Sequence, residues 1–259
     1  KQLEEDVVSV ISNLERIYKI SLVNNPQQAA ANFERNYRTL LVKELDRLEL
    51  FGVPQIQNYE LPLTIAYVSV YLLKWSDDKD VSSSIYSTPN SEYQRNLAIP
   101  AQAALVEHNR LMLIGTPGSG KTTLLKWVAV CTASQDISKY NNALDIWTDK
   151  IPFYLRIRDF AQKSLPSFEQ IPVQARGVSE LAAQLPYGWT DVQLSSGRAI
   201  VLLDGLDEVN EEKRQETYDW LKRLITIYPE ATYIVSTRPG TEHAKHTAER
   251  FKRAGFKKY

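Results

Sequence analysis

The sequence has one cysteine, no excess of either charge and no long apolar run. Cys131 alone cannot form an internal disulfide or a cysteine zinc site, which favours a reducing, cytoplasmic setting. Lys plus Arg and Asp plus Glu number 31 each, whereas a nucleic-acid-binding domain usually has a basic excess. The longest apolar stretch, residues 61–75, is interrupted by polar residues and is shorter than the ~18 residues of a membrane span. We therefore expect neither nucleic acid nor a membrane as a partner.

The two ends of the sequence lack the usual signals of a complete chain. It does not begin with methionine, it has no signal peptide, and it ends abruptly in a basic stretch. We therefore expect a piece of a longer protein. Its 259 residues suffice for one large domain, or for a medium-sized domain with a helical appendage.

A helical region is predicted for residues 1–55. A second helix from Pro26 to about Gly52 follows a first helix at residues 2–20. We expect that two such helices can form a hairpin and pack on each other or on the core. The alternative is a remnant of a partner-binding module. The apolar residues of the first helix recur in steps of four and three, and thus lie on one face: Leu3, Val7, Val10, Leu14 and Ile17.

The rest of the chain changes pattern twice. Residues 61–73 mix β-branched and aromatic side chains and predict a strand, and residues 76–96 are polar and predict a linker, so 56–97 is a connecting region. From about residue 110, apolar runs alternate with helical runs, which predicts an α/β fold with a mostly parallel sheet and helices on both faces. The predicted strands are 111–114, 152–157, 199–203 and 232–236, and the predicted helices are 121–131, 178–185 and 211–227.

A phosphate-binding loop joins the first of these strands to its helix. The pattern G-x-x-x-x-G-K-[ST] is complete. Its glycines allow the backbone to wrap around phosphate oxygens, and the helix that follows presents its positive end to the anion. Thr123 adds a hydroxyl contact or is an ordinary residue of the first helical turn. The predicted nucleotide-binding residues are Gly115, Thr116, Pro117, Gly118, Ser119, Gly120, Lys121, Thr122 and Thr123.

Three acidic residues follow the apolar run at 199–203. Asp204 lies at the carboxyl end of a buried strand, where α/β sheets bind their ligands, and is suited to hold Mg²⁺ together with Thr122. Asp207 and Glu208 are both candidates to orient the attacking water. The alternative is that the acidic turn only caps the next helix.

Arg238 follows the strand at 232–236 and precedes Pro239. In a parallel sheet this arginine reaches the same edge as Asp204, where a guanidinium can sense the γ-phosphate of the nucleotide. The alternative is a surface arginine that simply follows a strand.

Together these segments resemble a NACHT domain, a member of the STAND class of P-loop ATPases and a relative of the AAA+ fold. The segments are the P-loop, residues 151–160, residues 202–208 and residues 236–239. The Asp-Gly-Leu-Asp-Glu form of the acidic motif is the most specific mark. The resemblance covers about residues 100–240, with a weaker likeness of 60–75 to bacterial members, and does not extend to 1–55. We expect a NACHT-type P-loop NTPase domain over 98–259, truncated at its C-terminal side.

The resemblance implies a signalling switch of innate immunity or stress defence. Its ADP form is closed, and exchange for ATP permits homo-oligomerisation. On that basis Lys121 grips phosphate, Thr122 and Asp204 hold Mg²⁺, and Asp207 or Glu208 positions the water for slow ATP hydrolysis. Effector and sensor domains are expected outside this chain.

Two further expectations follow from the resemblance. Arg238 is the γ-phosphate sensor, acting within one subunit or across a subunit boundary. The family's winged-helix lid, with its ADP-contacting histidine, is expected beyond residue 259, since His243 and His246 come too early for that role.

The principal alternative function is an AAA+-type motor or loader acting on nucleic acid or protein. A scaffold with a purely structural nucleotide is a further alternative. We expect ATP rather than GTP, because the sequence has no Asn-Lys-x-Asp motif for reading guanine.

Overall fold

A seven-stranded mixed sheet runs through the molecule in the order β2-β1-β7-β3-β6-β5-β4. The computed structural model describes residues 26–47, 61–67, 70–74, 98–135, 142–175, 177–239 and 251–256. Five strands are parallel: β7 (Lys252–Phe256), β3 (Arg110–Ile114), β6 (Thr232–Thr237), β5 (Ala199–Asp204) and β4 (Ile151–Arg156). Two antiparallel strands complete one edge: β1 (Tyr71–Lys74) and β2 (Ala98–Pro100).

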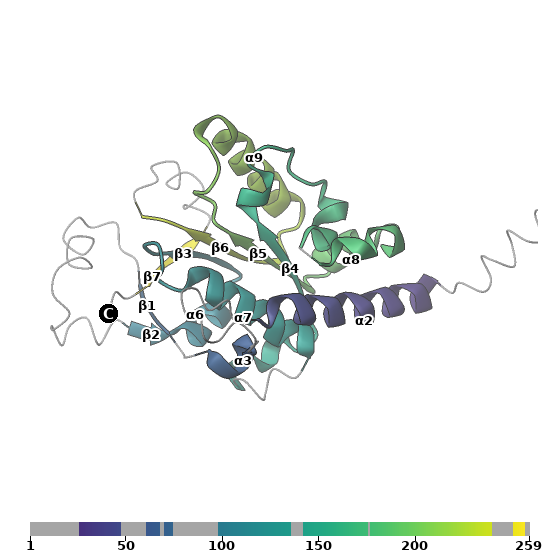
Figure 1. Cartoon of the computed structure of the whole chain (residues 1–259), viewed down its shortest axis with the longest axis horizontal. Coiled ribbons are helices and arrows are strands. Elements are labelled where there is room, and N and C mark those ends of the chain that lie inside the picture. The colour runs from purple at the N-terminus through teal and green to yellow at the C-terminus, as the bar shows by residue number, and fades with distance from the viewer. Residues whose placement is uncertain are drawn as a thin grey trace, which may run out of the picture.

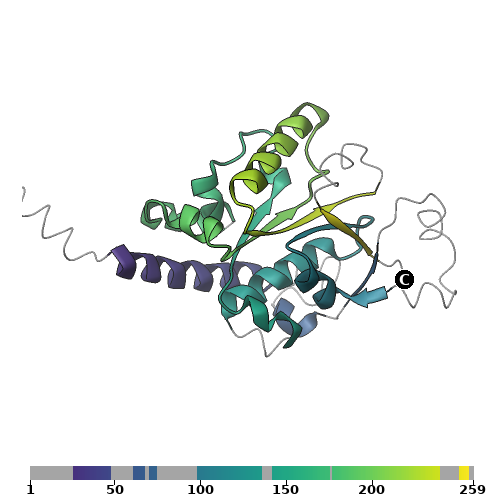
Figure 2. The same ribbon diagram turned by 180° about the vertical axis from the view of Figure 1, so that it is seen from behind.

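Two inner strands, β5 and β6, are buried along their whole length, which requires a helical layer on each face of the sheet. Figures 1 and 2 show α2, α3, α6 and α7 on one face, and α8 and α9 on the other. The predicted α/β fold with helices on both faces is therefore confirmed. The α-helices are α2 (Pro26–Leu45), α3 (Leu63–Ala66), α6 (Ala101–Glu107), α7 (Lys121–Ser134), α8 (Trp189–Ser195) and α9 (Glu211–Ile227).

Short 3-10 helices lie in two connections of the chain, between α7 and β4 and between β4 and the helix α8 that precedes β5. They are η3 (Asn142–Trp147), η4 (Ile157–Phe160), η5 (Phe168–Gln174) and η6 (Ser179–Gln184). In the ranges that the structure describes, no helix has the length and apolar character needed to cross a membrane.

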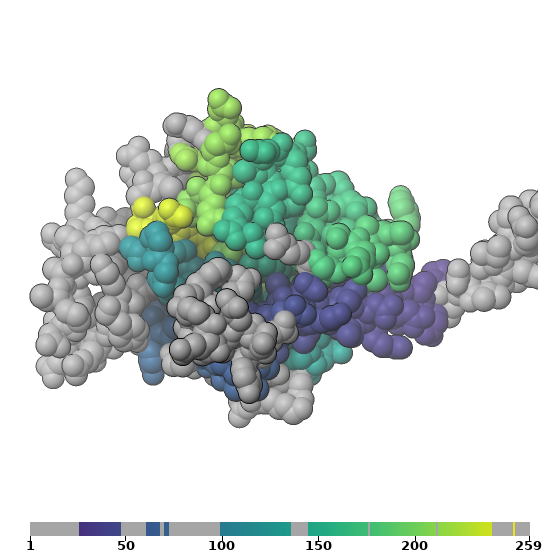
Figure 3. Space-filling view, in the orientation of Figure 1, coloured from purple at the N-terminus to yellow at the C-terminus, as the bar shows by residue number. Residues whose placement is uncertain are grey.

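The helix α2 packs directly on α7 and shares a hydrophobic core with the sheet. Its buried side chains recur in steps of four (Phe33, Tyr37, Leu41 and Leu45), as the sequence predicts for one face. The Tyr37 hydroxyl donates a hydrogen bond of 2.5 Å to the carbonyl of Pro152 at the start of β4. Figure 3 shows α2, in purple, running along the lower side of the green surface that includes α8. This helix therefore belongs to the same hydrophobic core as the sheet.

The strand predicted over residues 61–73 is wrong for most of its length. Among the described residues of this range, Leu63–Ala66 form the short helix α3, and strand pairing begins at Tyr71 in β1. Pro62 starts the helical turn, and Asp46 holds it by accepting hydrogen bonds from the Thr64 backbone N–H (2.8 Å) and hydroxyl (3.1 Å). Hydrogen bonds to a side chain 18 positions away, just after the end of α2, thus override the local β-propensity.

Other elements follow or extend the predictions. The helix predicted at 211–227 is observed with these bounds, and the one predicted at 178–185 is the 3-10 helix η6. The strands β2 and β7 and the helices α6 and α8 had not been predicted. The predicted helix at 2–20, the polar linker at 76–96 and both histidines of 241–250 lie outside the described residues, as do the boundaries at 55 and 97, which stay predictions.

Candidate nucleotide-binding site

The P-loop connects the carboxyl end of β3 to the first turn of α7. Gly118 and Gly120 have φ angles of +77° and +94°, which side-chain-bearing residues rarely adopt. Gly120 is the N-cap of α7. The loop thereby directs the free backbone N–H groups at the start of a 14-residue helix toward the carboxyl edge of the sheet.

Lys121 folds over this loop. Its Nζ donates hydrogen bonds to the carbonyls of Gly115 (2.6 Å) and Thr116 (3.0 Å) and lies 3.4 Å from the Ser119 hydroxyl. Burial lowers the pKa of Lys121, while the nearby carboxylates of the acidic motif oppose this effect. The side chain therefore places a cation against the inner side of the loop.

Asp204 receives hydrogen bonds from three different elements. The Thr122 hydroxyl of α7 donates to its Oδ1 at 3.1 Å, and the Ser236 hydroxyl of β6 donates to the same oxygen at 2.7 Å. The Tyr154 hydroxyl of β4 donates to Oδ2 at 3.2 Å. Asp204 is only 8% exposed. The structure places the Thr122 hydroxyl and the Asp204 carboxylate within hydrogen-bonding distance. Oxygens of these kinds fit the ligand preference of Mg²⁺, and the role of the pair as metal ligands stays a prediction.

Tyr154 and Ser236 are site residues that sequence reasoning missed. Burial and the negative charge of Asp204 raise the pKa of Tyr154, so its hydroxyl stays protonated and remains a donor. The available signal was a hydroxyl-bearing side chain in the second half of a buried strand in each case. Such a buried hydroxyl needs a partner, and Asp204 supplies it.

Asp207 ties the acidic turn to the end of β6. The backbone N–H of Arg238 donates to Asp207 Oδ1 at 3.0 Å, and Arg238 Nε lies 2.9 Å from Oδ2. The Asp207 side chain is 6% exposed and that of Arg238 is 50% exposed. Ser236 adds two further hydrogen bonds. Its hydroxyl accepts one from the backbone N–H of Gly205, and its carbonyl accepts one from the backbone N–H of Leu206, each at 2.8 Å. The acidic turn and the Thr-Arg-Pro turn therefore form one unit.

Glu208 lies over Gly205 at the rim of the site. Gly205 has a φ of +78°, and a Cβ at this position would come within 2.8 Å of Glu208 Cδ. Arg158 Nε lies 3.9 Å from Glu208 Oε2. Burial raises the pKa of Glu208, Arg158 lowers it, and Asp204 and Asp207 raise it further. A carboxylate of raised basicity thus stands at the open side of the site.

The predicted site residues converge on one edge of the sheet. The P-loop with Lys121 and Thr122, the acidic motif and Arg238 all follow the carboxyl ends of β3, β5 and β6. Thr123 lies in the first turn of α7, and its phosphate contact stays a prediction. Asp159, just after β4, pairs with Arg156 at 3.3 Å.

Comparison with known proteins agrees with this geometry. The family model described as the NACHT domain matches residues 109–258, which is more than half of the chain. A solved structure described as a DNA replication initiation factor is similar over 61% of this chain and 43% of its own, with 15% identity and a TM-score of 0.34. The chain therefore spans less than half of that protein, and so small a likeness says nothing of its function. No curated protein matches the chain significantly.

Proposed function

The chain belongs to the NACHT family of nucleotide-binding P-loop NTPases, and from this premise we propose that it is a slow, Mg²⁺-dependent ATPase that works as a signalling switch. In this proposal it binds ATP and ADP, and the exchange of one for the other controls homo-oligomerisation in innate-immune or stress defence. Sensor and effector domains outside this chain supply the trigger and the output.

The contact between Thr122 and Asp204 carries the proposal. Their oxygens are 3.1 Å apart although 82 positions separate them in sequence. This is the arrangement by which P-loop NTPases hold Mg²⁺, with a hydroxyl from the P-loop helix and a carboxylate from the end of a neighbouring strand. When bound, Mg²⁺ would neutralise phosphate charge beside this pair.

The remaining residues divide the chemistry among them. Lys121 and the start of α7 bind the phosphates. Glu208 accepts a proton from the attacking water and holds it in place, as its raised pKa and open position suit. Arg238, held by Asp207, presents a guanidinium at the same edge.

The link between Asp207 and Arg238 supports a switch rather than a simple hydrolase. It joins the turn after β5 to the turn after β6, so a change at one turn is transmitted to the other. The chain after β6 leads on to β7, which pairs with β1 and β3. Loss of the γ-phosphate at Arg238 would therefore change the position of the turn after β6, and this change would reach β7 and its neighbours in the sheet.

Calorimetric titration tests the proposal directly. The protein is titrated with ATP, ADP and GTP in the presence of Mg²⁺, beside Lys121→Ala and the control Lys222→Ala, which removes an exposed lysine of α9. We expect saturable binding of adenine nucleotides and none of GTP. Lys121→Ala should weaken binding about 10- to 100-fold, as expected for a lost charge-assisted hydrogen bond.

The control variant should bind like the unmodified protein. A folded protein that binds no adenine nucleotide, or that binds equally well without Lys121, would contradict the proposal. Oligomeric state is followed by light scattering with ATP and with ADP, and equal mass in both would contradict the switch.

A further inference from the structure

The hydroxyl of Tyr154 lies in a strand whose packing does not need it. Tyr154 is buried, and so are the residues on either side of it in β4. A phenylalanine ring would fill nearly the same volume, and a buried hydroxyl costs free energy unless it finds a hydrogen-bond partner. The partner is Oδ2 of Asp204, at 3.2 Å. The hydroxyl therefore serves Asp204 rather than the packing of β4.

The register of the sheet explains how the tyrosine reaches this acid. The strands β4 and β5 are parallel neighbours, and Tyr154 lies opposite Leu202, two positions before Asp204. Side chains two positions apart on a strand lie on the same face of the sheet. The tyrosine ring spans the diagonal between the two strands, and its hydroxyl ends at the carboxylate.

Hydroxyl groups occupy three of the about four lone-pair sites of the Asp204 carboxylate, two on each oxygen. Thr122 and Ser236 donate to Oδ1, at 3.1 and 2.7 Å, and so fill that oxygen. Tyr154 takes one site of Oδ2. The site that is left on Oδ2 can meet a cation or a water bound to it. The carboxylate can therefore approach a cation through one oxygen but not through both.

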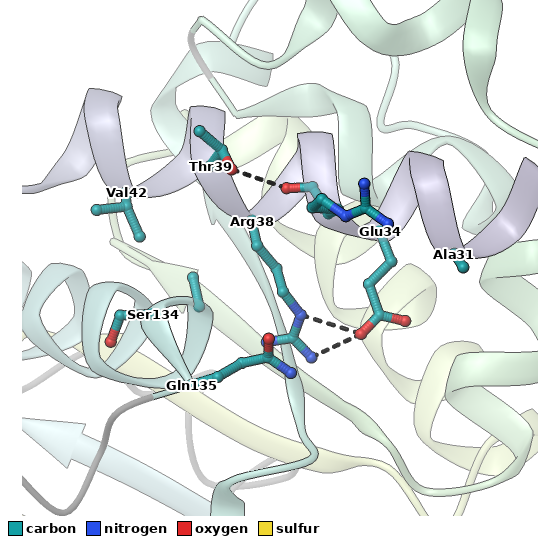
Figure 4. Close-up of a pocket in the computed structure, with 9 residues that line it drawn as sticks. Ala31, Glu34, Arg38, Thr39, Val42, Ser134 and Gln135 are labelled. Carbon is teal, nitrogen blue, oxygen red and sulfur yellow. Dashed lines mark hydrogen bonds and ion pairs between the residues drawn. The ribbon is translucent and has the colours of Figure 1, made fainter.

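The carboxylate of Glu34 in α2 shows a different way of holding an acid in this protein. Its oxygens accept hydrogen bonds from the guanidinium groups of Arg38 and Arg198, at 2.9 to 3.3 Å. Figure 4, a close-up of the groove between α2 and α7, shows the two bonds from Arg38. These cations neutralise Glu34. The donors to Asp204 are uncharged hydroxyls, so they fix its carboxylate and leave the negative charge for a metal cation.

We propose that Tyr154 is a positioning residue that makes the nucleotide site selective for Mg²⁺ over Ca²⁺. The proposal rests on the proposed function, in which Thr122 and Asp204 hold the metal. Mg²⁺ demands near-ideal octahedral geometry and is usually held by one or two carboxylates, whereas Ca²⁺ accepts flexible geometry and often both oxygens of a carboxylate. A carboxylate that is fixed on both oxygens and has one free site suits Mg²⁺ and disfavours Ca²⁺.

Loss of the tyrosine hydroxyl should release the carboxylate on one side. In Tyr154→Phe the two remaining donors, Thr122 and Ser236, both bind Oδ1. The carboxylate can then turn about its Cβ–Cγ bond and present both oxygens to a cation. Removal of a group that orients a metal ligand typically lowers metal affinity by about 10- to 100-fold. We therefore expect weaker binding of Mg²⁺ and retained binding of Ca²⁺.

Calorimetric titration of the full chain with ADP tests this assignment, in buffers that contain Mg²⁺, Ca²⁺ or EDTA. Tyr154→Phe is compared with the unmodified protein and with the control Tyr233→Phe. Tyr233 is a buried tyrosine at the start of β6, and its hydroxyl donates to the carbonyl of Tyr228 at 2.8 Å. The control therefore also loses a buried hydrogen bond, but at the opposite end of the sheet from the site.

The expected result is a loss that depends on the metal. In Tyr154→Phe the gain in ADP affinity from Mg²⁺ should fall about tenfold, while the affinities with Ca²⁺ and with EDTA stay within about twofold. The control should keep all three affinities. Melting temperatures without nucleotide show that each variant is folded.

The unmodified protein and the variant answer different questions. An unmodified protein that binds no ADP, or binds it without response to Mg²⁺, would contradict the proposed function and this inference with it. A response to Mg²⁺ that is the same in Tyr154→Phe would overturn this inference alone. Equal losses with Mg²⁺, Ca²⁺ and EDTA, or the same loss in Tyr233→Phe, would show a merely structural role and would overturn it as well.

A second variant acts on the other oxygen and serves also where Tyr154→Phe does not fold. Ser236→Ala removes one of the two donors to Oδ1 and so leaves a free site on each oxygen. We expect its preference for Mg²⁺ over Ca²⁺ in ADP binding to fall about tenfold. An unchanged preference in this variant, folded by its melting temperature, would overturn the proposal.

Discussion

The acidic motif shows how two neighbouring carboxylates take different parts. Both oxygens of Asp207 are engaged by Arg238, and the side chain is 6% exposed. The Glu208 side chain is 33% exposed, and its partial burial raises its pKa. The sequence alone left the choice between them open, and this geometry favours Glu208 as the base.

We predict that Glu208→Gln lowers the single-turnover rate of ATP hydrolysis by about 10²- to 10⁴-fold, because it removes the proton acceptor. Nucleotide affinity should change little. Asp207→Asn should instead lower the melting temperature, since the amide keeps only part of the link to Arg238. Hydrolysis and thermal unfolding measured on both variants check this, and a larger rate loss in the Asp207 variant would reverse the assignment.

The pH dependence of hydrolysis should report the same residue. Glu208 acts as a carboxylate, and its pKa is raised by burial, so activity should fall on acidification at a higher pH than an ordinary glutamate would give. Arg158 lowers this pKa, and Arg158→Ala should therefore move the acid limb to still higher pH. The control is Arg223→Ala, an exposed arginine of α9, which should leave the profile in place. A profile unmoved in both variants would argue against Glu208.

At the scale of elements, Arg38 of α2 joins three parts of the core. It donates to the carbonyl of Thr132 near the end of α7 and to that of Lys150 before β4, and its partner Glu34 reaches Arg198 before β5. A cation at the C-terminal end of a helix also complements the helix dipole. The helix α2 therefore holds the far end of the P-loop helix in place.

We predict that Arg38→Ala costs about 3 kcal/mol of unfolding free energy, because it leaves buried carbonyls and Glu34 without their donor. Arg223→Ala should change the same quantity by less than about 0.5 kcal/mol, as expected for an exposed site. Urea unfolding of the two variants provides the measurement. Equal stability of the Arg38 variant and the unmodified protein would mean that α2 contributes no more than surface packing.

At the scale of the whole molecule, the sheet order makes the site. The chain visits β3, β4, β5 and β6 in sequence, yet β3 lies next to β6 and not next to β4. This crossover places the P-loop, after β3, beside the turn at residues 237–239 that follows β6. The acidic turn follows β5, so one strand, β6, separates it from the P-loop strand. The crossover also separates the site, at the carboxyl edge, from the α2 network at the opposite ends of β4 and β5.

The sequence by itself determined the elements whose signals are local. The P-loop requires glycine at the positions with left-handed backbone, β5 is a continuous apolar run that ends in Asp204, and α9 shows a helical pattern over its whole length. Each of these depends on residues within one element, so periodicity and residue type suffice to predict them. The carboxyl edge as the place of the site follows from the parallel strands.

Only the tertiary structure decided the contacts made between distant segments. The hydroxyls of Tyr154 and Ser236 meet Asp204, both oxygens of Asp207 go to Arg238, and Asp46 turns residues 63–66 into a helix where the local pattern predicts a strand. In each case the partner is 18 or more positions away, so no local pattern contains it. The hydrogen bonds and burial that decide these points exist only once the chain has folded.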